Sequence, residues 1–378
     1  MKTAANLLCF CVLALLALGM VMLYSSVMAE RGGMHLLISQ GAFTLVGLAA
    51  CLIAASMDYR ILKALAWPFF AVSILLLVLV LIPNVGYRAN GASRWFREPH
   101  TKVQFEPSEL AKIALIIVLA WYGEYFQRQM GTFRRGVLLP GVFIGLMLGL
   151  IFVEPDVGSM MLLASVSGAL LLLAGVRWRF IVPPVLLALT GLGWFLWRDP
   201  MRSRRILAWL DVEKHKLDVG LQGKQAMLAF GSGGWTGLGL GNSRAKLGFL
   251  PEHHTDFIFP IIGEELGLIA TLAVILAYGL ILGCGLYISS RARDTFGMLL
   301  GSGITLLIGL QAAINIGVVT SALPNKGLPL PFISYGGSDL VILLACVGVL
   351  LSVGRHAPAL DGNVVTTEPD ALPEAQTA

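Results

Sequence analysis

Long apolar blocks, broken by short polar stretches, run through almost the whole chain. A bilayer core of about 30 Å requires about 20 consecutive apolar residues per helix. Backbone exposed to lipid must find its hydrogen bonds within closed elements, and the blocks lack the alternation of a membrane β-barrel. The pattern therefore predicts an all-α integral membrane protein with about ten transmembrane helices. The predicted spans are about 5–25, 36–56, 61–83, 108–126, 137–153, 159–175, 178–197, 258–288, 297–320 and 338–354.

The Lys and Arg residues of the short connections gather on one side of this predicted bundle. Cytoplasmic loops carry the excess of Lys and Arg in membrane proteins, and one set of loops here holds roughly twice as many as the other. That set consists of Lys2, Arg60, Lys63, Arg128, Arg134, Arg135, Arg177, Arg179, Arg291, Arg293 and Arg355. We therefore expect this side, and both termini with it, to face the cytoplasm. The basic stretch 84–107 would then lie outside, which is the contrary signal.

Two segments differ from the apolar blocks. Residues 198–257 form a predicted extracytoplasmic loop between helices 7 and 8, which is too long to be a plain connection. The tail at 357–378 is rich in Ala, Pro, Thr and acidic residues and has no apolar face, so we expect it to be disordered in the cytoplasm. Residues 1–356 then form one polytopic membrane domain, whose first block is a retained helix rather than a cleaved signal.

Composition supports a lipid environment and excludes several classes of protein. Of the 378 residues, 57% are apolar and 13% are charged, whereas soluble domains are about a quarter charged. The net charge of +5 comes from residues scattered at loop ends, so it does not indicate nucleic-acid binding. The five cysteines lie inside apolar runs without ligand spacing, which predicts neither a disulfide nor a zinc site.

The most informative polar cluster lies where the long outer loop returns to the membrane. Asp256 stands directly before the apolar block 258–288, and an Asp at that place is often a helix N-cap. The same position puts a carboxylate at the membrane–water boundary, where a helix N-terminus favours its ionised form. An ionised carboxylate can accept a proton from a sugar hydroxyl, which is the work of a general base. One residue can serve in both roles.

Several charged residues accompany Asp256. Together with it, His253 and His254 match no strong zinc spacing. A divalent cation, Mg or Mn, held jointly by a carboxylate and a pyrophosphate suits this set better. Glu264 and Glu265 lie about two turns into the same predicted helix, where ionisable groups usually face the bundle interior or a wet cavity. The alternative is a late helix start that leaves both glutamates at the interface.

Two further polar groups lie at predicted outer helix ends. Glu109 and Lys112 share one helical face, and form either a self-neutralising ion pair or a pair whose lysine meets a substrate phosphate. Arg94 precedes them in a basic, Trp-containing loop that suits either the lipid headgroups or a pyrophosphate. Glu154 and Asp156 flank a proline in a short outer turn, for which a simple proline turn is the alternative.

Glycine and proline mark two irregular segments. The run Gly231–Gly241 lacks the strand and βαβ context of a dinucleotide-binding loop, so we expect it to let the backbone fold tightly near the membrane. Residues 323–337 combine three prolines with three glycines, which bars a regular helix. Irregular backbone at membrane depth is tolerated only beside protein or a cavity. We therefore expect a re-entrant loop that lines a site and includes Ser334, rather than an ordinary outer connection.

Five stretches resemble, in order, the signatures of the SEDS family of membrane proteins. They are Asn90–Trp95, Pro107–Lys112, Glu154–Gly158, Leu250–Phe259 and Gly327–Gly337. The resemblance spans most of the chain, and two other pieces are similar to the cell-division branch of the family rather than to its elongation branch. These pieces are Met227–Trp235 and Gly239–Lys246, while Asn325, Lys326 and Asp339 depart from the family pattern.

The resemblance implies a peptidoglycan glycosyltransferase of the bacterial cytoplasmic membrane that acts at the division septum. Proteins of this family polymerise lipid II, an undecaprenyl-pyrophosphate-linked disaccharide peptide, and work with a class B penicillin-binding protein transpeptidase and other divisome proteins among membrane lipid. The family's essential aspartate matches Asp256, which makes it the expected catalytic residue. The substrate-binding candidates are Arg94, Glu109, Lys112, Glu154, Asp156, Lys246, His254, Glu264 and Ser334. No metal-ligating residue is assigned.

Other functions fit parts of the same sequence. A lipid II flippase or transporter would use broken helices and charges near the middle of the bilayer. A catalytic base is instead expected at the outer boundary, as for Asp256. A scaffold whose polar loop only docks a partner would leave polymerisation intact after Asp256→Ala. Within the family, an elongation-type polymerase is the alternative to the division enzyme.

Overall fold

The structure is a computed structural model of the chain. It describes residues 1–27, 33–83, 85–89, 92–97, 104–198, 203, 207, 209, 221–246, 254–324 and 327–358. The predicted tail from residue 359 onward lies outside these residues, as do the parts of the predicted outer loop at 210–220 and 247–253.

Every predicted transmembrane span is a helix among the described residues. The helices are α1 (Lys2–Val27), α2 (Met34–Ser56), α3 (Ile61–Ala64), α4 (Ala66–Leu81), α5 (Pro107–Tyr125), α6 (Leu139–Val153), α7 (Val157–Leu173), α8 (Trp178–Arg198), α11 (Ile258–Ser290), α12 (Thr295–Val319) and α13 (Gly337–Arg355). The third span differs from its prediction because it consists of two helices, α3 and α4, that meet at Leu65. Pro68 lies in the first turn of α4, where its missing N–H removes no helical hydrogen bond.

The helices differ in how strongly they favour a membrane. Six helical segments are long and apolar enough to cross one by length and composition: α1, α2, α11, α12, α13 and Arg134–Val153, which includes α6. The helices α4 and α7 and the first part of α8 are apolar but shorter. The remaining span, α5, carries Glu109, Lys112 and Glu124, yet most of its residues are buried inside the bundle.

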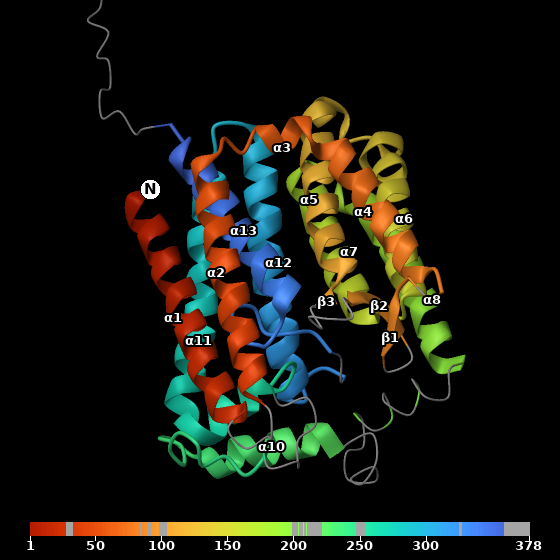
Figure 1. The fold of residues 1–378 in the computed structure, drawn as a ribbon. Coiled ribbons are helices and arrows are strands. Elements are labelled where there is room, and N and C mark those ends of the chain that lie inside the picture. Colours follow the sequence, from red (N-terminus) through yellow and green to blue (C-terminus); the bar gives the residue numbers. More distant parts are fainter. Residues whose placement is uncertain are drawn as a thin grey trace, which may run out of the picture.

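The bundle has two groups of helices and two distinct ends (Figure 1). One group contains α1, α2, α11, α12 and α13, the other contains α4 to α8, and α12 joins them by packing against α5 and α7. We call the end where α1 begins and α13 finishes the terminal face. The other end, where α5, α11 and α13 begin, is the loop face.

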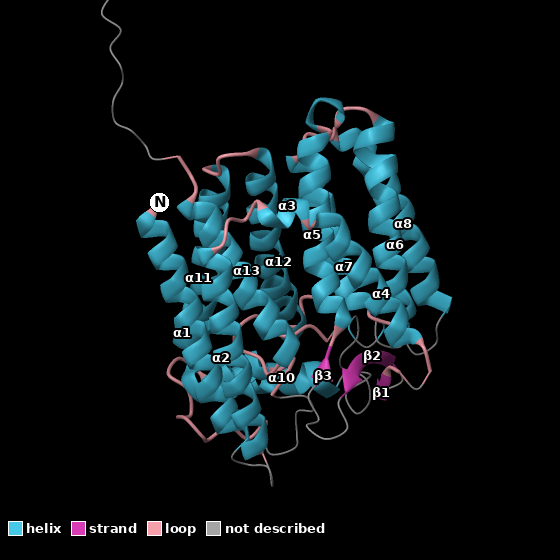
Figure 2. Ribbon diagram, turned by 45° about the horizontal axis from the view of Figure 1, so that its top comes forward, coloured by secondary structure: helices cyan, strands magenta, loops and turns pink. Residues whose placement is uncertain are grey.

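Short elements cover the loop face (Figure 2). The helix α10 (Leu221–Gly233) lies across this end of the bundle and packs against α11. A small antiparallel sheet of order β1-β2-β3 is formed by β1 (Tyr87–Ala89), β2 (Ala92–Arg97) and β3 (Gln104–Phe105). The sequence predicted only a basic loop there, because strands this short carry no readable alternation.

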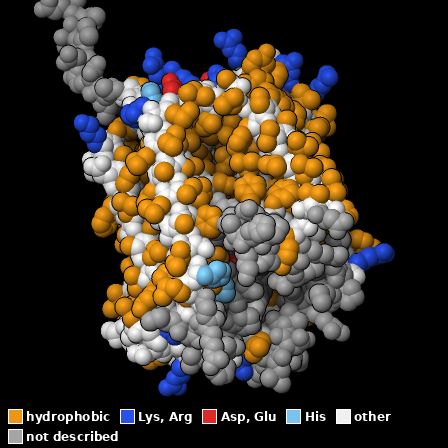
Figure 3. Space-filling model, viewed as in Figure 1, with side chains coloured by type: hydrophobic (Ala, Val, Ile, Leu, Met, Phe, Trp, Pro, Cys, Tyr) orange, Lys and Arg blue, Asp and Glu red, His pale blue; other side chains and the backbone are white. Residues whose placement is uncertain are grey.

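The outer surface has the polarity expected of a protein in lipid. Apolar side chains cover most of the described surface on the side of the bundle seen in Figure 3, and Lys and Arg line the edge of the terminal face. Leu45, Leu52 and Leu187 are each more than 70% exposed, with values of 71%, 71% and 75%. Such exposure of large apolar side chains is costly in water but favourable against lipid tails.

The long helix α11 is interrupted where the glycine-rich segment meets it. Gly267 has φ 79° and ψ −173°, so the helical hydrogen bonds stop there. Backbone groups of residues 234–239 replace those bonds. Leu238 N donates to Glu264 O (2.9 Å), Gly239 N to Glu265 O (3.0 Å), and Leu268 N to Gly234 O (2.9 Å). The glycine-rich segment thus folds tightly against the break, as the sequence predicted.

Only glycine fits at the centre of this contact. A Cβ on Gly267 would lie 2.4 Å from Gly237 N, and a Cβ on Gly237 would lie 2.1 Å from Glu265 O. The backbone conformation of Gly267 is also one that only glycine adopts readily, and other residues lose about 1–3 kcal/mol in it. Both the close approach and the dihedral angles therefore require these glycines.

We predict that Gly267→Ala destabilises the protein by about 1–3 kcal/mol or more, because it adds both backbone strain and a clash. Gly279→Ala on the same helix is the control, since a Cβ at Gly279 meets nothing within 4 Å. Ala is the better helix former, so the control should be neutral or stabilising by up to about 1 kcal/mol. Thermal unfolding in detergent measures both variants. Equal unfolding temperatures would contradict the assigned role of Gly267.

Candidate functional site

Asp256 lies at the loop face, in a non-helical turn at residues 254–257 that leads into α11. Its side chain is half-buried. The N-cap of α11 is Phe257, and no side chain caps this helix end by a hydrogen bond. The capping interpretation of Asp256 is therefore not supported, whereas a carboxylate at the boundary of the bundle is present as expected.

The turn that carries Asp256 is held by hydrogen bonds from other parts of the chain. Each of its first three carbonyl groups accepts a hydrogen bond from α12 or from the segment before α13. The donors are Tyr335 N to His254 O (3.0 Å), Ser334 Oγ to Thr255 O (2.6 Å) and Asn315 Nδ2 to Asp256 O (2.8 Å). Two substrate-binding candidates, His254 and Ser334, thus lie beside Asp256 and shape its turn.

Residues 327–336 make up most of the segment 323–337 that was predicted to be re-entrant, and they are non-helical and largely buried within the bundle; we call them the re-entrant segment. Its backbone carbonyls accept hydrogen bonds from side chains of α2, α11 and α12. These are Asn315 Nδ2 to Leu328 O (2.6 Å), Gln311 Nε2 to Pro329 O (3.1 Å), Tyr278 Oη to Pro331 O (2.5 Å) and Gln40 Nε2 to Ser334 O (3.2 Å). Irregular backbone is tolerated inside the bundle because protein groups satisfy it.

A second polar group surrounds the start of α5. Lys112 Nζ lies 2.7 Å from Glu109 Oε2, and both side chains are almost fully buried. Asp339, from the first turn of α13, is also buried and accepts hydrogen bonds from Gln311 Nε2 at 3.3 and 3.4 Å. The predicted pair is therefore a buried ion pair at the start of α5, and Asp339 adds a third buried ionisable side chain at the start of α13.

The turn between α6 and α7 brings three more candidates together. Arg94 Nε donates to Glu154 O (2.9 Å), and another Arg94 nitrogen donates to Pro155 O (2.6 Å). Asp156 is the N-cap of α7, where it accepts a hydrogen bond from Ser159 N (3.2 Å). Arg94 thus anchors β2 to this turn, and the charge of Asp156 is stabilised by the helix end.

Glu154 is the least satisfied of these residues. Its side chain is fully buried, and neither carboxyl oxygen has a hydrogen-bond partner among the described residues. Burial, followed by the neighbouring charge of Glu106, raises the pKa of Glu154 to about 9. Burial and the charge of Glu109 likewise raise the pKa of Glu106 to about 8. At neutral pH Glu154 therefore carries a proton and can donate a hydrogen bond.

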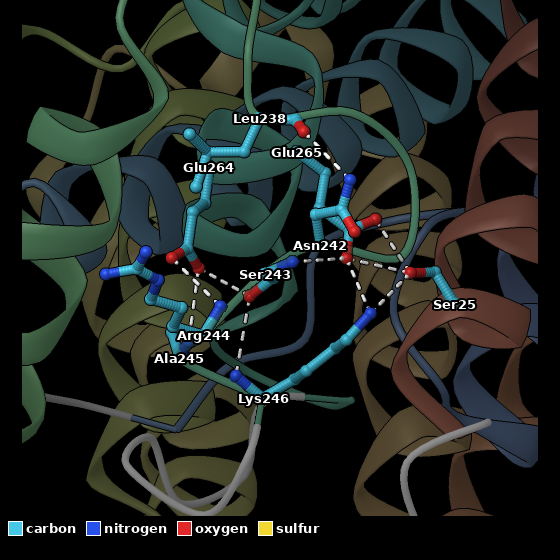
Figure 4. Close-up of polar contacts among 9 residues, drawn as sticks. All are labelled: Ser25, Leu238, Asn242, Ser243, Arg244, Ala245, Lys246, Glu264 and Glu265. Atoms are coloured by element: carbon cyan, nitrogen blue, oxygen red, sulfur yellow. Dashed lines mark hydrogen bonds and ion pairs between the residues drawn. The ribbon is translucent and has the colours of Figure 1, made fainter.

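Figure 4 shows a third polar group, in which the outer loop is fastened to α1 and α11. Lys246 Nζ lies 2.8 Å from Glu265 Oε1 and 3.0 Å from Ser25 Oγ. Ser25 Oγ in turn donates to the Glu265 carboxylate at 2.7–2.8 Å. All three residues are buried. The ion pair thus joins the end of α1, the start of α11 and the loop that precedes residue 247.

The Glu264 carboxylate is enclosed by the same loop (Figure 4). It accepts hydrogen bonds from Arg244 N (3.0 Å), Ala245 N (3.2 Å) and Ser243 Oγ. Successive backbone N–H groups that converge on one anion form a favourable concave site. Glu264 and Lys246 therefore have partners within the protein, and the interior placement expected for at least one of the two neighbouring glutamates holds for both.

The described residues contain no group of three or more His, Cys, Asp or Glu side chains placed to hold a metal ion. The five cysteines are free thiols.

The chain matches a known protein family over nearly its whole length. A family model for FtsW, RodA and SpoVE, described as cell cycle proteins, matches residues 5–358. The chain belongs to the FtsW/RodA/SpoVE family. This assignment confirms the resemblance found in the sequence.

The individual relatives of the chain carry the name of the division branch of the FtsW/RodA/SpoVE family. The chain is 42% identical over 348 residues to a probable peptidoglycan glycosyltransferase FtsW of Geobacter metallireducens, covering 91% of this chain and 92% of that protein. It is 38% identical over 352 residues to the protein of the same name from Coxiella burnetii, covering 91% and 94%.

Solved structures of the family share the fold. A structure that concerns the coordination of polymerization and crosslinking by a peptidoglycan synthase complex matches with a TM-score of 0.76 and 29% identity, covering 92% of this chain and 96% of that chain. The rod shape determining protein RodA of Thermus thermophilus matches with a TM-score of 0.68 and 30% identity, covering 92% and 95%. The multi-pass helical architecture expected for the family is therefore confirmed.

Sequence reasoning missed several residues that organise this family member's site. Gln40, Gln311 and Asn315 each lie in an otherwise apolar helix, and each supports the re-entrant segment. A polar side chain inside a membrane span is costly and usually has a bundle partner, so isolated amides in apolar blocks were the available signal. Ser25 was harder to find, because a serine near a helix end is unremarkable in composition.

We predict that Lys246→Met destabilises the protein by about 3–5 kcal/mol, because it leaves the buried carboxylate of Glu265 without its counter-charge. The double variant Lys246→Met with Glu265→Gln should recover much of this loss. Lys224→Met on α10 changes a half-buried lysine and should stay within about 0.5 kcal/mol of the parent. Thermal unfolding in detergent compares the four proteins. An unchanged Lys246→Met protein would show that this ion pair does not hold the loop.

Proposed function

We propose that this FtsW/RodA/SpoVE family member polymerises lipid II into glycan strands on the outer side of the bacterial cytoplasmic membrane. The names of its relatives support a peptidoglycan glycosyltransferase. The single observation that carries the mechanism is the position of Asp256. Its half-buried carboxyl group belongs to a fixed turn at one end of the helical bundle, where a sugar hydroxyl can meet it at the membrane boundary.

The proposed reaction needs a base and a stabilised leaving group. Asp256 accepts the proton of the GlcNAc 4-hydroxyl of lipid II. That oxygen forms a bond to the MurNAc anomeric carbon of the growing strand. The bond from this carbon to the pyrophosphate oxygen breaks, and undecaprenyl pyrophosphate leaves with the bonding electrons. Negative charge develops on the pyrophosphate, and fixed cations stabilise it. Lys112 and Arg94 are the cations proposed for this role.

The distribution of buried charge favours catalysis over transport. Among the described residues, every buried Asp, Glu, Lys or Arg lies in a loop or in about the first two turns of a helix at the loop face. They are Glu109, Lys112, Glu154, Asp156, Lys246, Glu264, Glu265 and Asp339. A transporter would instead need such groups near the middle of the bundle. The charges here suit a reaction at one surface of the membrane.

A divalent cation is proposed to enter with the substrate. Mg²⁺ and Mn²⁺ bind well when a protein carboxylate and a pyrophosphate share their coordination shell. The carboxyl groups of the loop face provide candidate ligands, of which Asp256 is the one beside the reacting sugar. The cation would neutralise charge on the pyrophosphate, while the chain's own residues position the hydroxyl group and accept its proton.

The proposed setting follows from the family relatives. A matching structure is a peptidoglycan synthase complex, which supports a class B penicillin-binding protein transpeptidase as the partner. The FtsW names of the relatives favour the septum and other divisome proteins. The Lys and Arg residues at the terminal face support cytoplasmic termini, so that the loop face lies outside.

We predict that Asp256→Asn lowers polymerisation of purified lipid II by about 100-fold or more, because it removes the base but keeps the size of the side chain. Gel analysis of the glycan made with the transpeptidase partner measures the rate. Asp58→Asn changes a carboxylate at the terminal face and should leave the rate unchanged. Comparable product from Asp256→Asn and the parent would remove Asp256 from the mechanism and favour a scaffold.

We predict that a chelator stops polymerisation and that added Mg²⁺ or Mn²⁺ restores it, because the cation neutralises the leaving pyrophosphate. The thermal unfolding temperature of the protein without lipid II should stay unchanged in chelator, since the cation comes with the substrate. Full activity in excess chelator would exclude the proposed cation.

A further inference from the structure

The turn that carries the proposed base gets its shape from distant segments. Residues 254–257 make no helical turn of their own, yet three successive carbonyl groups from His254 to Asp256 are hydrogen-bonded. Two of the donors, Ser334 and Tyr335, belong to the re-entrant segment, and the third is Asn315 of α12. The backbone of Asp256 is thus fixed by groups about 60 to 80 residues away along the chain.

Asn315 connects the two segments with a single amide group. Its Nδ2 donates to Asp256 O at 2.8 Å and to Leu328 O at 2.6 Å, and the residue is 1% exposed. An NH₂ group has two hydrogens, so both bonds can form together. Because the two carbonyls belong to different segments, any movement of the re-entrant segment at residue 328 is passed directly to Asp256.

Gly327 controls the space available to the carboxylate itself. A Cβ at this residue would lie 2.6 Å from Asp256 Oδ2, and the next nearest atom is Asp256 Cγ at 3.6 Å. The backbone of Gly327 is outside the left-handed region, so an alanine would meet no backbone strain there. A side chain at residue 327 would therefore collide with the carboxylate of Asp256, and among the described residues it would meet no other side chain or backbone within 4 Å.

We propose that the re-entrant segment is the positioning device for the Asp256 carboxylate, with Asn315 and Gly327 as its positioning residues. Asn315 holds the main chain of Asp256 in place, and Gly327 leaves room for the carboxyl group where the structure places it. This inference rests on the proposed role of Asp256 as the base. The inference also gives a reason for an irregular, proline-rich segment inside the bundle. This segment places the backbone of Gly327, which has no side chain, against the carboxylate of Asp256.

The device acts on rate rather than on stability or binding. The atom that an added methyl group would strike is the end of a side chain, which can rotate away at little cost. The fold therefore tolerates Gly327→Ala, but the carboxylate moves. Displacing a catalytic group by about 1 Å costs up to roughly 100-fold in rate, because proton transfer requires hydrogen-bond distance.

The test compares Gly327→Ala with Gly168→Ala in the lipid II polymerisation assay with the partner. In the control, which lies on α7 outside the re-entrant segment, the added Cβ meets no atom of the described residues within 4 Å. We expect Gly327→Ala to lower kcat by roughly 10- to 100-fold while the KM for lipid II and the unfolding temperature stay within error. Gly168→Ala should match the parent.

Asn315→Ala tests the other positioning residue independently. It should lower kcat more than it changes the KM for lipid II, because it frees the turn without touching the substrate. Thr320→Ala is its control on α12, since Thr320 Oγ1 bonds only within its own helix, to Ile316 O at 2.7 Å and Gly317 O at 3.3 Å. This control should behave as the parent does.

The outcomes separate this inference from the proposed function. Parent-like kcat in both Gly327→Ala and Asn315→Ala, with an inactive Asp256→Asn protein, would overturn the inference and leave the base assignment standing. A rise in KM with unchanged kcat would overturn it too, since Gly327 would then act on substrate binding. An active Asp256→Asn protein would remove the base, and the positioning device with it. If Gly327→Ala fails to fold, the clash is not confined to the carboxylate and the inference also fails.

Discussion

The structure depends on one constraint, which is that backbone groups at membrane depth must find protein partners. Most of the chain meets it with helices. The segment 327–336 cannot form a helix. Its backbone carbonyls find their partners by accepting hydrogen bonds from side chains of α2, α11 and α12. One of the amides that support this segment, that of Asn315, also holds the turn of Asp256. Satisfying the backbone and building the site are therefore the same physical problem.

Charge is distributed unequally between the two ends of the bundle. The charged side chains that the described residues bury lie at the loop face, and each of the three polar groups there joins separate parts of the chain. The Lys246–Glu265 pair fastens the outer loop, Arg94 fastens the small sheet, and Asp339 of α13 accepts hydrogen bonds from Gln311 of α12. Buried charges that are paired in this way contribute specificity of arrangement more than net stability.

The spans could be predicted because apolar blocks of membrane length have few alternatives. Asp256, Glu109 and Lys112 could be singled out because their charges interrupt or border such blocks. The sequence could not show that Phe257 rather than Asp256 is the N-cap of α11, since helix ends depend on the packing of the preceding turn. It also gave little sign of the small sheet, or of the contacts of Asn315, which join residues far apart in the chain. Such contacts become visible only when the helices are assembled.

The break at Gly267 divides α11 into two parts that lie in different surroundings. The part of α11 after the break is longer than the roughly 20 residues that a bilayer core requires. It can therefore tilt as membrane thickness varies. The two turns before it hydrogen-bond to the glycine-rich loop instead and do not share that helical ladder. A change in lipid composition can therefore alter the tilt of the long part of α11 without changing the orientation of Asp256, which precedes the helix.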